Sequence, residues 1–162
     1  MKKLVIFTAL ALLFSPLYAS AATTGVANVT MTIPVILDIA LDAGAQTVAD
    51  SVTLANMQAG FKDAIAGGNI TINTNNTWSL NVKAGALTFT GTGNNTKSVN
   101  ALAASIDAGA YVSLNGTTDV VLKAAGQTAE TNGSHAMLYK FTFDQTYVPG
   151  TYIAALTYTV SN

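Results

Sequence analysis

Short runs in which apolar and polar residues alternate dominate this sequence and limit what it can fold into. In residues 23–33 the side chains at positions 27, 29, 31 and 33 are apolar, and Asn or Thr lies between them. A period of two is typical of a strand with one buried face. Similar runs recur about every ten residues with Gly, Asn or Pro between them, which favours strands joined by turns. We therefore expect an all-β fold, a single antiparallel β-sandwich with Greek-key topology.

The same patterns predict where the later elements lie. Two hairpins are expected, at residues 70–82 around Asn75-Asn76 and at residues 111–122 around Asn115-Gly116, because turn residues separate two apolar runs in each. The other expected strands are residues 35–41, 87–89, 137–143 and 152–160. Residues 43–50 and 124–134 are expected to be loops, and residues 51–66 a strand followed by a helical turn. Residues 99–106 are expected to be an alanine-rich connection that can contain a helical turn.

The first 21 residues have the layout of a secretory signal peptide. Two lysines precede an apolar run at residues 4–14, and small residues lead up to Ala21. The run is too short for a stable transmembrane helix. We therefore expect a secreted protein, outside the cell or at its surface, with no membrane span in the mature chain. The expected organisation is a cleaved signal peptide at 1–21, an N-terminal strand at 22–33 and the sandwich domain at 34–162.

The composition argues against several classes of function. The chain has no Cys, no Arg and one His, so a zinc or iron–sulfur site built from Cys and His is not expected. Without the signal peptide, five lysines (seven minus two) face eight acids, and no basic patch suggests nucleic acid. Charged residues are 9% of the chain, against about a quarter in typical domains. A weakly charged surface resists self-association poorly. One interpretation is therefore that the protein binds copies of itself. The other is that a low content of charged residues is simply common among bacterial surface proteins.

The single tryptophan, Trp78, stands in a Trp-Ser-Leu triplet that begins an alternating run. The alternation places Trp78 on the same strand face as Leu80 and Val82. Burying a tryptophan removes roughly 200 Å² from water, so a core plug between two sheets is favoured over an exposed platform for a sugar or a partner. The residues expected to form a core signature are Trp78, Leu80, Phe141, Tyr152, Leu156 and Tyr158.

No catalytic motif is recognisable, so an enzyme is not expected and no cofactor is assigned. His135 follows Ser134 in a segment of loop composition. An exposed histidine is favoured there over a Ser–His pair, because adjacency in sequence supplies no orienting acid. Asp38, Asp42 and Asp50 form a loose cluster whose spacing matches no calcium loop. We therefore assign no catalytic or metal residues.

Two stretches resemble the WxL domain of surface proteins in Gram-positive bacteria. One is the triplet Trp78-Ser79-Leu80, and the other is the Pro-Gly-Thr-Tyr turn at residues 149–152 before the last strand. Where the family carries its second Trp-x-Leu, this chain has Tyr158-Thr159-Val160, an aromatic-x-aliphatic triplet. The resemblance implies a surface module that attaches to the cell wall or to a partner.

Both ends of the chain resemble bacterial fimbrial subunits assembled by donor-strand exchange, in particular chaperone–usher pilins of the colonisation-factor type. The stretch VANVTMTIPVILDIALDAG alternates and leads into Pro34, and the last strand follows a Gly-x-Tyr turn. The resemblance implies an immunoglobulin-like sandwich whose groove accepts a strand from a neighbour. Residues 22–33 would be the donor strand, which can pair within its own chain or in trans. Its inward face would grow from small to large: Gly25, Ala27, Val29, Met31 and Ile33.

Three classes of function are open on the sequence alone. The first is a non-enzymatic structural subunit of an extracellular fibre, pilus or surface matrix, with copies of itself as partners. The second is a WxL-like module attached to the cell wall or to a partner. The third is a small β-sandwich that binds a small ligand or a host or surface glycan, or an enzyme whose motif is not recognised.

Overall fold

A computed structural model describes residues 28–93 and 95–162. The chain divides into two units, Met1–Ile33 and Pro34–Asn162. The boundary lies at the proline that ends the first alternating run. The expected signal peptide, and Gly25 and Ala27 of the expected donor face, lie outside the described residues. Among the helices of the described ranges, none has the length and apolar character needed to cross a membrane.

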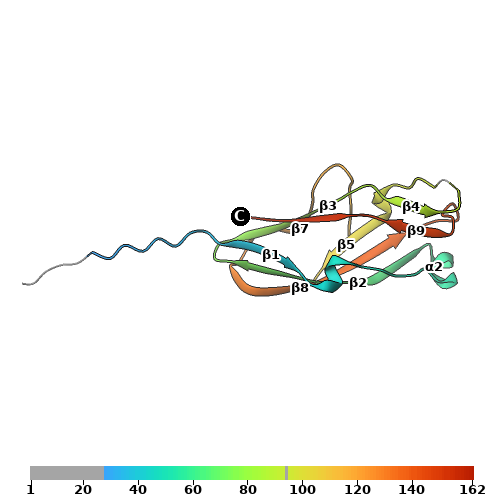
Figure 1. The fold of residues 1–162 in the computed structure, drawn as a ribbon. Helices are drawn as coiled ribbons and strands as arrows, with labels where there is room; N and C mark the ends of the chain where they lie inside the picture. The colour runs from blue at the N-terminus through green and yellow to red at the C-terminus, as the bar shows by residue number, and fades with distance from the viewer. Residues whose placement is uncertain (1–27, 94) are drawn as a thin grey trace, which may run out of the picture. The chain divides into compact units, whose positions relative to one another are not determined.

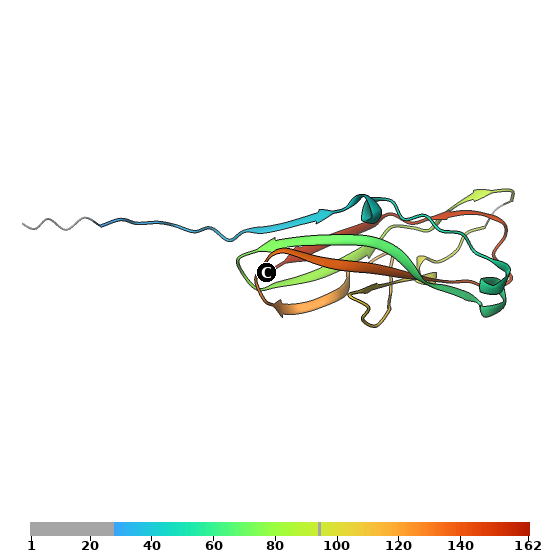
Figure 2. The ribbon, with the colours of Figure 1, turned by 90° about the horizontal axis from the view of Figure 1, so that it is seen from below.

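Residues 34–162 form an all-β sandwich of antiparallel strands in two facing layers (Figure 1). One sheet has the order β1-β2-β8-β5-β6, and the other has the order β10-β3-β7. Figure 2 looks from below onto β2 and β8. The strands of the first sheet are β1 (Leu37–Leu41), β2 (Phe61–Thr74), β5 (Leu102–Ile106), β6 (Val112–Ser113) and β8 (Glu130–Thr142). The second contains β3 (Trp78–Ala84), β7 (Val120–Gln127) and β10 (Leu156–Ser161).

A short strand pair continues the second layer beyond β3 and β10. β4 (Thr88–Gly91) pairs with β9 (Gly150–Ile153). In the chain, β4 follows β3 and β9 precedes β10. Residues 154–155 interrupt the edge between β9 and β10. The two strands therefore act as one long edge with a single irregularity.

Six of the strands follow the order of an immunoglobulin sandwich in which one strand position is open, and β6 and β7 lie outside this correspondence. Constant-type immunoglobulin domains have strands A, B, E and D in one sheet and C, F and G in the other. In this chain β1, β2, β8 and β5 take the places of A, B, E and D, while β3 and β10 take those of C and F. Strand G would lie beside F, yet β3 is the one neighbour of β10 among the described strands. The β10 edge is therefore free.

The hydrophobic core lies between the two sheets, and Trp78 is part of it. Its side chain is 2% exposed, and its indole N–H donates to the Thr128 carbonyl oxygen at 2.8 Å. The core plug interpretation fits this placement, whereas an exposed platform does not. The same buried cluster includes Ile70, Ile72, Leu80, Val82, Met137 and Tyr139.

Three short helices complete the domain: α1 (Ala43–Gln46), α2 (Leu54–Ala59) and the 3₁₀ helix η1 (Val99–Ala101). Asp42 caps α1 by accepting a hydrogen bond from the Ala45 N–H at 2.7 Å. α1 packs on β2 at Gly68, where φ is +67° and an added Cβ would lie 2.2 Å from the Ala45 nitrogen. A larger residue at 68 would displace α1, because the position is both left-handed and in close contact.

Both hairpins expected from the sequence are wrong. Residues 70–73 belong to β2 and residues 78–82 to β3, but these strands lie in different sheets. Likewise β6 pairs with β5 and β7 pairs with β3, so the Asn115-Gly116 turn also crosses between sheets. The reason is physical: alternation fixes which face of a strand is buried and leaves its hydrogen-bonding partner undetermined.

Four other segments differ from expectation. The expected loop at 124–134 is largely strand, where β7 ends and β8 begins. In residues 51–66 the helix α2 precedes the strand instead of following it, and α1 lies within the expected loop at 43–50. The alanine-rich residues 102–106 form β5, because small residues have a weak intrinsic preference and sheet neighbours decide their conformation.

The expected half-buried strand is not formed by residues 28–33. They belong to no helix or strand. The side chains of Val29, Met31 and Ile33 are 88%, 81% and 74% exposed. Three apolar side chains of the expected donor face are therefore in contact with solvent.

Candidate functional site: an open groove beside strand β10

An apolar groove of about 740 Å³ opens along the β9–β10 edge. It lies between that edge and residues 45–52, the segment that follows β1. Side chains of both sheets line it, so the groove reaches into the space between the sheets. The apolar and aromatic lining residues include Leu41, Ile65, Leu87, Leu102, Tyr139, Phe141, Tyr152, Ala154, Leu156 and Tyr158.

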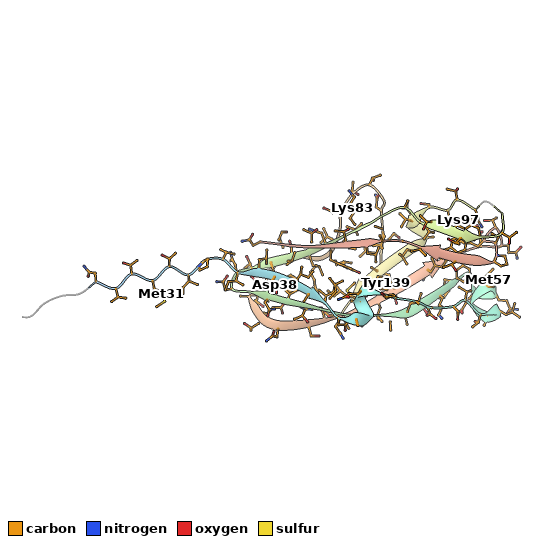
Figure 3. All side chains as sticks on the ribbon, in the orientation of Figure 1. Met31, Asp38, Met57, Lys83, Lys97 and Tyr139 are labelled. Atoms are coloured by element: carbon orange, nitrogen blue, oxygen red, sulfur yellow. The ribbon has the colours of Figure 1, made fainter. Side chains whose placement is uncertain are left out.

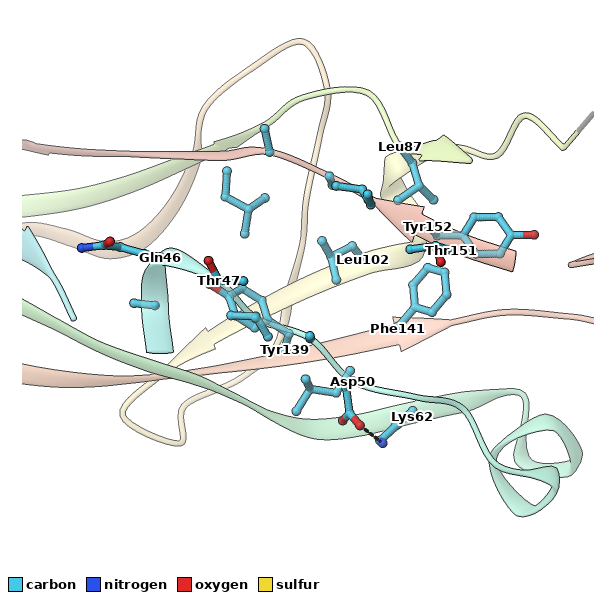
Figure 4. A pocket seen from close by; sticks show the side chains of 18 of the residues that line it. Gln46, Thr47, Asp50, Lys62, Leu87, Leu102, Tyr139, Phe141, Thr151 and Tyr152 are labelled. Carbon is cyan, nitrogen blue, oxygen red and sulfur yellow. Dashed lines mark hydrogen bonds and ion pairs between the residues drawn. The ribbon is translucent and has the colours of Figure 1, made fainter. Parts of the chain in front are cut away.

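The groove leaves part of the hydrophobic core uncovered. Figure 4 shows Leu87, Leu102 and Phe141 directed into it from segments far apart in the chain. Leu102, Phe141 and Leu156 pack against the buried core yet remain half-buried. Covering apolar surface of this kind contributes roughly 25 cal/mol for each Å² removed from water. An apolar ligand or segment in the groove would therefore stabilise the domain.

One rim of the groove is a strand edge with free main-chain groups. The Gly85 N–H donates to the Ala155 carbonyl oxygen at 2.7 Å, so the main chain of Ala155 points toward β3. β10 continues this register to Ser161. Successive residues of a strand direct their main-chain groups to opposite sides. The N–H and C=O groups of Leu156, Tyr158 and Val160 therefore point to the open edge.

The opposite rim is an extended segment held to the sheet by an ion pair. Residues 48–52 belong to no helix or strand and are exposed. The Lys62 ammonium of β2 donates to the Asp50 carboxylate, as the dashed line in Figure 4 marks, and to the Ser51 carbonyl oxygen at 2.8 Å. The hydrogen bond from Lys62 lowers the pKa of Asp50 below its ordinary value.

Two tyrosines form a polar bridge across the groove. Tyr139 of β8 and Tyr158 of β10 share a hydrogen bond between their hydroxyl groups, and so link the two sheets. Figure 3 shows Tyr139 inside the sandwich. Burial raises the pKa of Tyr139. Burial, and then the neighbouring Tyr139, raise the pKa of Tyr158. Both phenols are therefore neutral at physiological pH.

The expected core signature divides between the core and this groove. Trp78 and Leu80 are fully buried, whereas Phe141, Tyr152, Leu156 and Tyr158 line the groove. The expected signature did not include other apolar lining residues, among them Leu41, Ile65, Leu87, Leu102, Tyr139 and Ala154. The alternating pattern marks inward-facing side chains, but it carries no signal for which of them stays uncovered.

His135 is not the exposed loop histidine expected from its neighbours. It lies on β8, and its half-buried ring is edge-on to Trp78 at a centroid distance of 5.3 Å. Its Nδ1 lies 2.8 Å from a carboxylate oxygen of Asp107, and its Nε2 lies 3.0 Å from one of Glu130. Burial disfavours the charged ring, but the hydrogen bonds to Glu130 and Asp107 outweigh burial and raise the pKa of His135.

The His135 cluster joins the two sheets at the edge away from the groove. Asp107 lies in the turn after β5, in the first sheet, and also contacts the ammonium of Lys123 at 3.0 Å. Lys123 belongs to β7, in the second sheet. Both ring nitrogens of His135 face carboxylates, and Ser134 is exposed on the other face of β8. The structure therefore does not bring Ser134 and His135 together as a pair.

The three aspartates noted as a loose cluster have separate roles. Asp42 caps α1 and accepts a hydrogen bond from the Asn69 N–H at 2.9 Å. Asp50 pairs with Lys62, and Asp38 is exposed on β1. Within residues 28–93 and 95–162, no group of three or more acidic or histidine side chains could hold a metal ion.

Comparison of the sequence with protein-family models and with curated proteins finds no match. The uncovered groove and the free edge of β10 are therefore the features from which a function can be proposed.

Proposed function

We propose that this protein is a non-enzymatic, secreted structural subunit of an extracellular fibre, pilus or surface matrix. In this proposal each copy donates its N-terminal segment, residues 22–33, to the groove of a neighbouring copy. The observation that carries the proposal is the open strand position beside β10, which combines free main-chain groups with an uncovered apolar floor.

Strand addition would satisfy both parts of this site at once. A strand laid along β10 would hydrogen-bond to the outward main-chain groups of Leu156 and Tyr158, while alternate side chains fill the groove. Exposed edges and uncovered apolar surface favour association with another chain. The segment proposed as donor supplies exposed apolar residues at alternate positions, Val29, Met31 and Ile33.

Assembly into a fibre sets the direction of the donated strand. β1 begins and β10 ends at the same end of the domain, next to residues 75–77 (Figure 1). The donated strand continues into β1 of its own domain, which begins at this end. If the strand leaves the groove at the opposite end of the accepting domain, it joins unlike ends of successive copies. Contacts between unlike surfaces repeat as an open filament, whereas contacts between like ends close into a dimer. The donated strand should therefore run antiparallel to β10.

Deletion of residues 22–31 tests the proposal. The mature full-length chain should form filaments visible by electron microscopy, and the deleted chain should not. A synthetic peptide of residues 22–33 should bind the deleted chain and raise its melting temperature, whereas the same peptide with Val29, Met31 and Ile33 replaced by Ser should not. A full-length chain that stays a soluble monomer at high concentration would contradict the proposal.

A further inference from the structure

The tyrosine bridge closes the groove at one end. On the β9–β10 side, the described lining residues run from Thr151 to Tyr158 and no further, and Leu41 is the β1 residue that lines it. β1 and β10 lie close to each other. The hydroxyl groups of Tyr139 and Tyr158 meet between the sheets at this closed end. A large side chain directed inward over the bridge would therefore collide with the two phenols.

The open part of the groove has room for a limited set of side chains. From the bridge outward, the half-buried residues on the inward face of the edge are Leu156, Ala154 and Tyr152. Tyr158 and Tyr152 are six residues apart, which corresponds to about 20 Å of strand. A strand paired antiparallel to this edge would direct one inward side chain beside each of these three positions.

The donor face has a matching number of large side chains. Val29, Met31 and Ile33 are its three large residues, and the next residue on that face toward the N-terminus is Ala27. In the antiparallel direction Val29 would lie beside Leu156, and Ala27 would lie over Tyr158. In the parallel direction with Ile33 over the bridge, Ala27 would lie beside Tyr152, which leaves both a clash at the bridge and a void at the far end of the groove.

We infer that the Tyr139–Tyr158 bridge fixes the register of the donated strand, with Ala27 of the neighbouring copy over the bridge and Val29, Met31 and Ile33 in the open groove. The two tyrosines are then the residues that determine which side chain can occupy this position. The inference rests on the proposed function and specifies the partner surface within it.

A bump-and-hole experiment in the mature full-length chain tests this register. Ala27→Leu should weaken association about tenfold to a hundredfold, because overpacking at a closed site is costly. Asn28→Leu adds similar bulk on the opposite strand face and should leave association unchanged. A second substitution that removes one phenol, Tyr158→Ala or Tyr139→Ala, should restore filaments to the Ala27→Leu chain. Filament mass measured by sedimentation and electron microscopy is the readout.

The outcomes separate this inference from the proposed function. Filaments of the unmodified chain that are lost in Ala27→Leu and regained with either tyrosine substitution support the register. Ala27→Leu filaments at the unmodified level, or no rescue by either substitution, overturn the register while the fibre proposal stands. Absence of filaments from the unmodified chain overturns the fibre proposal itself, and the register with it.

Discussion

At the scale of single residues, His135 is the most unusual side chain of the domain. Each ring nitrogen faces a carboxylate, Asp107 on one side and Glu130 on the other. A neutral imidazole has one N–H and can donate to one of them, whereas the protonated ring donates to both. The raised pKa of His135 reflects this arrangement. The ring packs against Trp78 of the second sheet, and its partner Asp107 also contacts Lys123 of that sheet.

This arrangement predicts a pH-dependent contribution to stability. His135→Gln should lower the free energy of unfolding by about 1–2 kcal/mol at pH 6, since hydrogen bonds to charged groups are lost. The folded pKa of His135 is raised above 6.5, so its stabilisation is full below that value and is lost as pH rises through the folded pKa. Asp107 has a lowered pKa, so its contribution is lost at the acid side, below about 3.8.

Urea denaturation of both proteins between pH 5 and pH 9 measures this effect. The difference between the unmodified chain and His135→Gln should be largest near pH 5 to 6 and should shrink toward pH 9. A difference that stays constant over this range would show that the ring acts by packing alone.

At the scale of elements, β10 separates an inward face from an exposed face. Leu156, Tyr158 and Val160 pack against the core, while Thr157 and Thr159 are exposed. The apolar residues at positions 153 and 155 suggest that both faces of this edge could be buried. The structure shows one buried face, because Ile153 and Ala155 are exposed. The strand therefore offers its inward side chains to the groove and its main chain to the open edge.

Two aspartate substitutions one residue apart test this polarity. Leu156→Asp places a carboxylate among half-buried apolar groups and should cost about 2–4 kcal/mol of unfolding free energy, with loss of filaments. Thr157→Asp points to solvent and should change stability by less than about 0.5 kcal/mol. Urea unfolding and filament yield are the measurements. Equal damage from the two substitutions would show that both faces of β10 are covered in the functional protein.

At the scale of the whole molecule, the sequence predicts strand faces well and strand partners poorly. Alternation correctly places a strand at residues 78–82 and one within residues 35–41, and it indicates that Trp78 faces inward. The single strand expected at residues 152–160 is instead divided into β9 and β10. Alternation does not distinguish a hairpin from a crossing between sheets, because each choice buries the same face. The groove could not be predicted for a similar reason, because its lining comes from segments distant in the chain. Nothing in the local sequence around Leu87 or Leu102 indicates that these side chains line an open groove.

The position of the C-terminal end permits a single-chain test of the proposed assembly. β10 ends where an antiparallel donated strand would begin, so a copy of residues 22–33 joined after Asn162 by a short flexible Gly/Ser linker can enter the groove of its own chain. With the original residues 22–33 removed, this variant should be a monomer that forms no filaments. Burial of three large side chains, at about 1.5–3 kcal/mol each, should raise its melting temperature by at least about 10 °C over the deleted chain.

The matched control replaces Val29, Met31 and Ile33 of the appended copy with Ser, and should melt like the deleted chain. An appended strand that stabilises no more than this control, measured by calorimetry and light scattering, would contradict strand donation as the way the groove is filled.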